Sequence, residues 1–339
     1  MKEISDVKLH MHLLEMEITN RCNLNCAHCY NRGETKEDMP FPEMIELFHF
    51  AQKYGVSKLV ISGGEACLHQ KLPEFLSYIS NHKQRTKEKM PKIVLQSNGK
   101  IRDYLSTLDL SGVDLVHLSF DIDENGVRKI DENETVQLAK QLKEKGVQAY
   151  FFATIHKNNQ NHIEEMVEIA NKNQIPIAFN LCSETGKNEE ILLTKEERIQ
   201  AYKKLLAYEK KGKIRPVKHP HLAVLRYTEE ELKQDDKIHG GCTAGIGSCS
   251  VLSNGDVIPC PFLRKKAGNI REKGEKNIEE TLVDIWLHAP LFTILRKRNE
   301  YAICKDCKYL NYCGGCRSSA MLSTEKINGF DRACLKKIS

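Results

Sequence analysis

Residues 19–30 read Thr-Asn-Arg-Cys-Asn-Leu-Asn-Cys-Ala-His-Cys-Tyr, and this stretch decides how the rest of the chain is interpreted. Its three cysteines, Cys22, Cys26 and Cys29, supply three thiolates for a tetrahedral or cubane metal site and leave the fourth corner to something else. Thiolates at this density select zinc or iron-sulfur clusters. A purely structural site would not leave a position vacant, so the pattern indicates chemistry.

Composition makes metal ligation the default explanation for the cysteines. The 339-residue chain has 13 of them, and Met1 to Asn20 show no signal-peptide pattern. No later segment approaches the roughly 20 apolar residues that span a bilayer. We therefore expect a cytoplasmic protein without a membrane partner, in a compartment where reductants keep thiols free of disulfides.

The charge balance argues against a nucleic-acid partner. The 51 Lys and Arg residues nearly match the 46 Asp and Glu residues, which leaves a formal net charge of +5. The longest basic runs, 264–266 and 296–298, have no interleaved aromatic residues. Such runs are typical of a solvated face.

From residue 13 to about 210, short β-branched runs alternate with amphipathic stretches, which predicts repeated βα units around a parallel sheet. The fold class is therefore α/β, with a partial (β/α)6 barrel of the TIM type. The expected strands are Leu14–Ile18, Lys58–Ile61, Lys92–Gln96, Leu115–Phe120, Gln148–Ile155 and Ile175–Leu181. The expected helices are Pro42–Lys53, Pro73–Asn81, Asn133–Lys145, Asn161–Asn173 and Lys195–Glu209.

The composition changes after the barrel. We expect a core domain over 1–212, a bridging segment over 213–239 and a small cysteine-rich domain over 240–339, which holds eight of the cysteines. A hairpin is predicted from Ser248–Ser253 to Asp256–Pro259, because Asn254-Gly255 suits a type I′ turn. Few residues of this domain besides the cysteines are expected to form a core.

Small polar residues follow several of the predicted barrel strands. Ser62-Gly63-Gly64-Glu65 ends the second strand, Ser97-Asn98-Gly99 ends the third, and the fourth carries Ser119 and Asp121. In a βα barrel the loops after the strands converge on one face. The glycine pair permits a close backbone approach to a ligand, so these residues predict one binding site together with the cysteine loop.

Taken in order, Cys-x3-Cys-x2-Cys followed by Tyr30, Gly-Gly-Glu and Ser-x-Asp resemble the radical S-adenosylmethionine (SAM) superfamily. The resemblance implies a 4Fe-4S cluster on Cys22, Cys26 and Cys29, whose fourth iron binds SAM, and cleavage of SAM to a 5′-deoxyadenosyl radical that abstracts hydrogen. It further implies that Gly63, Gly64 and Glu65 contact the methionine amino group of SAM and that Ser119 and Arg128 contact its carboxylate. The Tyr30 backbone would contact the adenine, with Asn98 and Asp121 nearby. The alternative is a zinc site completed by His28, which leaves the other motifs unexplained.

The eight C-terminal cysteines are enough for two four-coordinate sites. Cys242-x12-Gly255-x4-Cys260, Cys304-x2-Cys307-x5-Cys313-x2-Cys316 and a final Cys334 resemble the SPASM domain that follows radical SAM barrels. The resemblance implies two auxiliary 4Fe-4S clusters, hence three in all: one on Cys242, Cys249, Cys260 and Cys316, the other on Cys304, Cys307, Cys313 and Cys334. Many family members have three residues where Cys313-Gly-Gly-Cys316 has two. The alternative is a pair of zinc knuckles.

Proteins of this type include peptide and protein maturases, so the leading hypothesis is an oxidoreductase that cross-links, oxidises or epimerises a ribosomally made peptide. About 13 residues precede the first strand, which are too few for a leader-recognition module, so we expect a separate leader-recognition protein as a partner. A flavodoxin- or ferredoxin-type electron donor is a second expected partner. The alternatives are oxidation or rearrangement of a small metabolite, sulfatase maturation, and a redox-sensing protein without catalysis. Pro261 disfavours sulfatase maturation, because sulfatase maturases usually have Asp at this position.

Two cysteines stand outside the clusters, Cys67 after Gly-Gly-Glu and Cys182 near the end of the sixth strand. Both positions approach the barrel mouth. Radical SAM peptide epimerases use a lone cysteine as a hydrogen-atom donor, and Cys182 is the better placed candidate. The competing interpretation is that each is a small buried hydrophobic residue.

Overall fold

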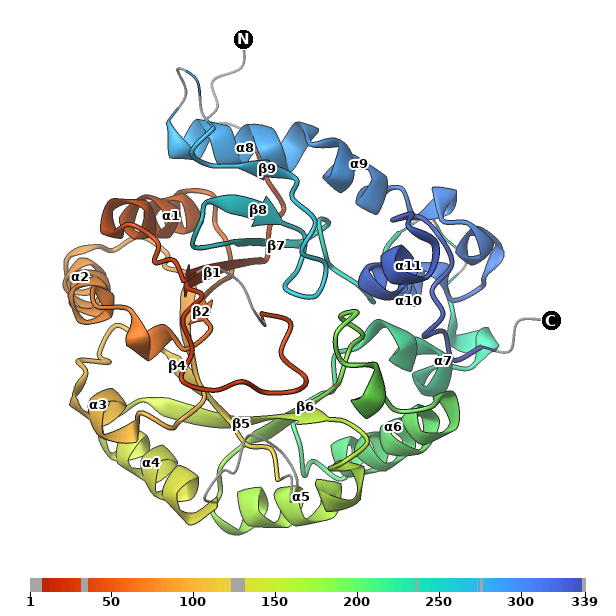
Figure 1. The fold of residues 1–339 in the computed structure, drawn as a ribbon, viewed down its shortest axis with the longest axis horizontal. Helices are drawn as coiled ribbons and strands as arrows, with labels where there is room; N and C mark the ends of the chain where they lie inside the picture. Colours follow the sequence, from red (N-terminus) through yellow and green to blue (C-terminus); the bar gives the residue numbers. More distant parts are fainter. Residues whose placement is uncertain are drawn as a thin grey trace.

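The structure is a computed structural model that describes residues 8–31, 36–122, 132–233, 235, 237–272, 274 and 277–336. Six parallel strands curve around a common centre with helices outside them (Figure 1). They are β1 (Leu13–Thr19), β2 (Lys58–Gly63), β3 (Lys92–Ser97), β4 (Leu115–Ser119), β5 (Gln148–Ile155) and β6 (Ile177–Leu181). The expected partial barrel is confirmed. No helix in the described ranges is long and apolar enough to cross a membrane.

The outer helices lie close to their predicted positions. They are α1 (Phe41–Lys53), α2 (Leu72–Arg85), α4 (Glu132–Glu144), α5 (Ile163–Lys172) and α6 (Lys195–Lys210). Helix α6 begins at a capping box in which Thr194 and Glu197 satisfy each other's backbone N–H groups. Helix α3 (Arg102–Thr107) was not predicted, since six residues give little periodicity.

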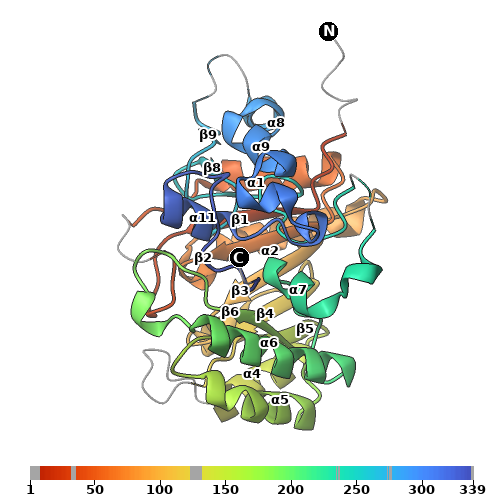
Figure 2. The ribbon, with the colours of Figure 1, turned by 90° about the vertical axis from the view of Figure 1, so that its right-hand side faces the viewer.

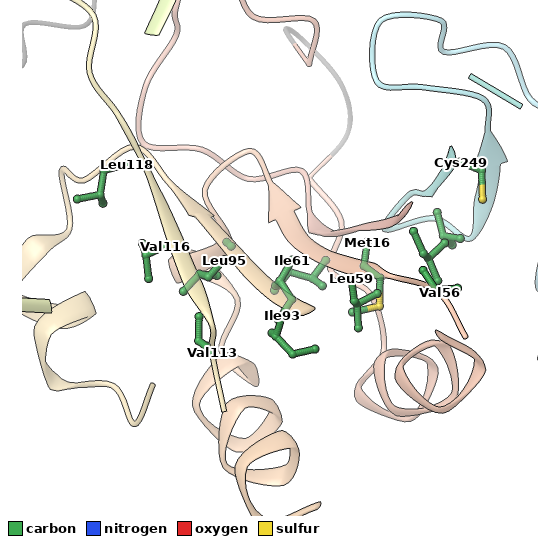
Figure 3. Close-up of a cluster of buried hydrophobic side chains, with 14 of the residues drawn as sticks. Met16, Val56, Leu59, Ile61, Ile93, Leu95, Val113, Val116, Leu118 and Cys249 are labelled. Carbon is green, nitrogen blue, oxygen red and sulfur yellow. The ribbon is translucent and has the colours of Figure 1, made fainter. Parts of the chain in front are cut away.

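Strand β1 shows how the sequence sorts side chains between the two faces of the sheet. Leu14, Met16 and Ile18 are fully buried in the layer between sheet and helices, which Figure 3 shows around Met16 and Leu59. Glu15 and Glu17 alternate with them, so they point into the barrel. Two acidic residues at inward positions indicate a polar interior.

The C-terminal region continues the barrel sheet. Strand β7 (Ser248–Val251) pairs in parallel with β1, then β8 (Asp256–Ile258) and β9 (Gly268–Asn269) follow antiparallel, so the sheet order is β6-β5-β4-β3-β2-β1-β7-β8-β9. The predicted hairpin is present, but its turn differs. The Leu252 carbonyl accepts from the Gly255 N–H at 2.8 Å and only Gly255 has positive φ, which describes a longer turn than type I′.

Short helices complete the C-terminal region: α7 (Ala223–Arg226), α8 (Ile278–His288), α9 (Pro290–Arg296), α10 (Leu310–Cys313) and α11 (Arg317–Thr324). Helices α8 and α9 lie on the side of α1 in both ribbon views (Figures 1 and 2). Trp286, Phe292 and Leu295 are buried in the same core as the barrel residues. These apolar side chains therefore join the core of the barrel.

Candidate functional site

The C-terminal ends of all the barrel strands meet at one cavity of about 190 Å³. In Figure 1 the segment after β1 runs over the open centre of the barrel. Of the sequence-predicted residues, the cavity is lined by Cys29, Tyr30, Gly63, Gly64, Asn98, Ser119 and Cys182. Glu65 and Asp121 are buried beside it, and Arg128 lies outside the described residues. The structure therefore brings the separate motifs together, as a βα barrel requires.

N–H groups donate to two of the sulfur atoms of the cysteine loop. The Leu24 N–H donates to Cys22 Sγ at 3.4 Å, and the Asn31 N–H donates to Cys29 Sγ at 3.3 Å. Asn98 Nδ2 lies 3.9 Å from Cys22 Sγ, which links the loop to the end of β3. Hydrogen bonds to sulfur stabilise thiolates and tune iron-sulfur clusters. The donor set therefore fits a cluster at this loop.

The glycine pair after β2 is required by the chain segment that leads into the cysteine loop. A Cβ atom on Gly63 would lie 2.4 Å from the Thr19 carbonyl oxygen, and one on Gly64 would lie 2.4 Å from the Arg21 carbonyl oxygen. The Gly64 N–H donates to that Thr19 oxygen at 2.8 Å. Both glycines also line the cavity. They serve close packing of backbone on backbone as well as access for a ligand.

Glu65 and Asp121 connect neighbouring strand ends. Glu65 accepts from the backbone N–H groups of Asn98 at 2.7 Å and Cys67 at 3.1 Å. Burial raises the pKa of the Glu65 carboxyl, although these hydrogen bonds act in the opposite direction. Asp121 accepts from the Thr154 N–H at 2.6 Å. In this structure both carboxylates hold the rim of the site in place.

One wall of the site comes from the C-terminal region and was missed by the sequence analysis. Arg264 donates to both carboxylate oxygens of Glu17, at 3.0 and 3.2 Å, and lies 5.6 Å from the centroid of the Tyr30 ring. Phe262 packs edge-on against Tyr30 at 5.5 Å. Burial, followed by the charges of Glu15 and Glu17, raises the pKa of Tyr30 well above its usual value. The signal that could have found this wall is the pair of acidic residues inside an apolar strand.

Cys182 and Cys67 differ in their access to the cavity. Cys182 lines the cavity of about 190 Å³ at the strand ends, and its sulfur accepts from Asn188 Nδ2 at 3.2 Å. Burial raises the pKa of the Cys182 thiol to about 12, so it stays protonated at neutral pH. Cys67 is 5% exposed and belongs to the apolar core. Its surroundings match the buried-hydrophobe interpretation.

The C-terminal cysteines gather in two places. Four of them, Cys304, Cys307, Cys313 and Cys334, line one largely apolar cavity of about 30 Å³. Three others, Cys242, Cys260 and Cys316, line a second cavity of about 480 Å³. The Gly315 N–H donates to Cys313 Sγ and the Leu263 N–H to Cys260 Sγ, each at 3.3 Å. These donor sets fit clusters, but Cys249 is not among the residues that line either cavity.

Within the described residues, no three His, Cys, Asp or Glu side chains are arranged to hold a single metal ion. His28, the alternative fourth zinc ligand, lines the cavity of about 190 Å³, with its ring centroid 5.7 Å from that of His156. Zinc requires four donors at about 2.0–2.3 Å from one atom. A cubane spreads its thiolates over different irons and so accepts wider spacing.

Comparison with known proteins gives matches along most of the chain. The radical SAM superfamily matches residues 16–170, and the SPASM iron-sulfur cluster-binding domain matches residues 242–308. An AdoMet-dependent heme synthase of Methanosarcina barkeri is 28% identical, over 92% of this chain and 93% of that protein. A PqqA peptide cyclase of Rhizobium meliloti is 24% identical, over 94% of this chain and 86% of that protein.

Among solved structures, Streptococcus suis SuiB bound to its precursor peptide SuiA matches 96% of this chain and 76% of its own, with a TM-score of 0.74 and 19% identity. This likeness establishes the fold. The fold, the cysteine loop at the barrel mouth and the two domain matches lead to one conclusion. The chain belongs to the radical SAM superfamily and is a radical SAM enzyme with a C-terminal SPASM domain.

Proposed function

We propose that this enzyme modifies a ribosomally made peptide by cross-linking, oxidation or epimerisation, with one SAM-binding and two auxiliary 4Fe-4S clusters. When bound, SAM and its cluster supply the hydrogen-abstraction chemistry of the superfamily. We assign SAM to the cavity of about 190 Å³ at the strand ends, called the cofactor cavity below. The observation that carries the peptide proposal is the shape of the space beside it. Ser183 lines the cavities of about 190, 340 and 480 Å³, so all three adjoin at one residue. Such a run of cavities suits an extended chain.

The protein's own residues position the reactants and exclude water. By the family resemblance, Cys22, Cys26 and Cys29 hold the cluster, and Gly63, Gly64 and Ser119 face the methionine portion of SAM. Asn98 donates to Asn23 Oδ1 at 2.8 Å and so steadies the cysteine loop. Tyr30 and Phe262 cover one side of the cavity with aromatic surface. Exclusion of water protects a reactive intermediate from side reactions.

Cys182 is the proposed hydrogen-atom donor if the product is an epimer. It lines both the cofactor cavity and the adjoining cavity of about 340 Å³, and its thiol keeps its hydrogen at neutral pH. The Cys182→Ala variant should still form 5′-deoxyadenosine but stall with a substrate radical or an abortive product. Unimpaired conversion of the peptide would assign Cys182 to packing alone.

A second candidate substrate is a tetrapyrrole, because the heme synthase relative spans nearly the whole chain. The cavity of about 340 Å³ supports it with polar groups suited to carboxylates. Tyr202 Oη, Arg198 Nε and His219 Nδ1 are buried there without hydrogen-bond partners among the described residues. Unpaired buried polar groups are costly unless a ligand satisfies them.

One experiment distinguishes the two substrates. The anaerobically reconstituted enzyme is incubated with SAM, reductant and either peptides encoded beside its gene or an iron porphyrin with propionate groups, and both are analysed by mass spectrometry. A peptide lighter by two mass units supports a cross-link or oxidation. Unchanged mass with deuterium uptake from solvent supports epimerisation. Conversion of the porphyrin with unchanged peptides would replace the peptide proposal with the tetrapyrrole. Adding a flavodoxin, a ferredoxin or a leader-recognition protein tests the proposed partners by the same readout.

A further inference from the structure

Cys249 is turned away from the cysteines with which the family resemblance groups it. On β7 it lies opposite Leu14 of β1. Its neighbour Ser250 donates to Glu15 Oε2 at 3.3 Å inside the barrel. Because side chains alternate along a strand, Cys249 must point to the opposite face, toward the helices. It is 1% exposed, and Figure 3 shows it beside the buried apolar layer that includes Met16 and Leu59.

The other three cysteines of that group share a different environment. Cys242, Cys260 and Cys316 line the cavity of about 480 Å³, together with Ser183 and Asn180 from the end of β6. They come from three separate segments that the fold joins: the Cys242 N–H donates to the Cys313 carbonyl at 3.0 Å, next to the turn that carries Cys316. Cys249 cannot reach this cavity without a reversal of strand β7, which would place Ser250 in the apolar layer and Cys249 against Glu15.

We propose that three cysteines of this chain, Cys242, Cys260 and Cys316, hold the first auxiliary cluster, and that Cys249 is an apolar core residue. The assignment rests on the two auxiliary clusters proposed above. A 4Fe-4S cubane with three thiolate ligands has one iron free for an external donor. The three cysteines would present that iron to the cavity of about 480 Å³, which shares Ser183 and Asn180 with the cofactor cavity. A thiolate or an imidazole nitrogen is the class of ligand that such an iron binds.

The first test compares Cys249 with Cys260, which follows β8, the second strand of the same hairpin. Cys249→Ala and the bulkier Cys249→Val should keep all irons of the wild type, about twelve for three cubanes, and the same electron paramagnetic resonance (EPR) spectrum when reduced. Cys260→Ala should lose about four irons. If either Cys249 variant with native circular dichroism loses four irons, the proposal is overturned.

The second test detects the free iron directly. In the Cys22, Cys26 and Cys29 to Ala triple variant the SAM cluster is absent, so only auxiliary clusters remain. Addition of ¹³C-cyanide should give ¹³C hyperfine coupling on one reduced cluster. The same treatment of a variant that also carries Cys260→Ala should give none. Absence of coupling in the triple variant contradicts a free iron.

Neither test uses a substrate, so a failed peptide assay leaves their outcome unchanged. The wild-type iron content separates the two ways in which the assignment can fail. About eight irons or fewer would remove an auxiliary cluster from the proposed function. About twelve irons together with iron loss in the Cys249 variants would refute only the ligand assignment.

Discussion

The two cysteine regions of this molecule bring their cysteines together in opposite ways. Cys22, Cys26 and Cys29 lie within eight residues on one loop after β1. The C-terminal cysteines span residues 242–334 and meet only because the fold joins distant segments. We therefore expect that a local cluster site can be lost without unfolding its surroundings, whereas a distributed site is part of the tertiary structure.

Side chains of the C-terminal region show how the distributed site is assembled. The buried carboxylate of Asp331 accepts from His221 Nε2 and from the Cys316 N–H, each at 2.6 Å. Arg298, 3% exposed, donates to the carbonyls of Gly240 at 3.0 Å and Cys242 at 2.6 Å. The C-terminal cysteines therefore depend on buried polar groups far away in the sequence.

The largest expected effect comes from removing the local site. Replacing Cys22, Cys26 and Cys29 together by Ala should abolish 5′-deoxyadenosine formation, because SAM loses the iron that binds it. About eight irons should remain, the content of two cubanes, and the circular dichroism spectrum should stay native. The product is measured by chromatography after anaerobic incubation with SAM and reductant. SAM cleavage retained by this variant would refute the site assignment.

Removing one ligand of the distributed site should affect folding as well as iron. Cys334→Ala is expected to lose about four irons and to lower the yield of soluble protein, because binding energy at a ligand-dense site is largely folding energy. Lys326→Ala, an exposed side chain in the same segment, is the matched control and should change neither quantity. A soluble Cys334→Ala protein with full iron content would show that Cys334 is not a ligand.

Loss of one partner of the ion pair between Glu17 of β1 and Arg264 of the C-terminal region should destabilise the fold. The Glu17 side chain is 4% exposed and that of Arg264 is 15% exposed. Arg264→Gln leaves the Glu17 carboxylate buried without its cation, which costs about 3–5 kcal/mol. Chemical denaturation measures this loss. Arg271→Gln is the control, because the Arg271–Glu43 pair also joins the C-terminal region to α1 but the Arg271 side chain is 36% exposed. This variant should lower the free energy of unfolding by less than about 1 kcal/mol. Equal costs for the two variants would contradict a buried junction.

A smaller effect is expected from Glu15, which accepts from Ser62 at 2.7 Å and Ser250 at 3.3 Å at the same junction. Burial raises the pKa of Glu15 to about 7. Because the folded-state pKa lies above the unfolded value, stability is full below about pH 4.5 and declines as pH rises to about 7, by at most about 3 kcal/mol. Glu15→Gln lacks this decline. The melting temperature of Glu15→Gln relative to the wild type should therefore be higher at pH 8 than at pH 5.5. A difference between the two proteins that does not change with pH would argue against a buried carboxyl.

Local features of this fold are predictable from the sequence, whereas pairings between distant segments are not. All six barrel strands and five helices follow from alternating or helical apolar patterns within single segments. The parallel pairing of β7 with β1 could not be predicted, because it joins residues more than 230 positions apart. The contact between Arg264 and Glu17 could not be predicted for the same reason, because it depends on that pairing.

The candidate site divides in the same way. The cysteine loop, Gly63, Gly64, Asn98 and Ser119 are recognisable as motifs, and the structure places them around one cavity. The motif order could not predict that Glu65 and Asp121 hydrogen-bond to backbone N–H groups of neighbouring strands. Nor could it reveal that Cys249 faces the apolar layer, since a side chain's face depends on the register between two strands.

We have proposed that ten cysteines in two differently built regions hold three cubane clusters. The most direct measurement is iron, sulfide and zinc content per chain of the wild-type protein after anaerobic reconstitution. We expect about twelve irons, about twelve sulfides and almost no zinc. Stoichiometric zinc, or about four irons with the C-terminal cysteines free to react with a thiol reagent, would contradict it.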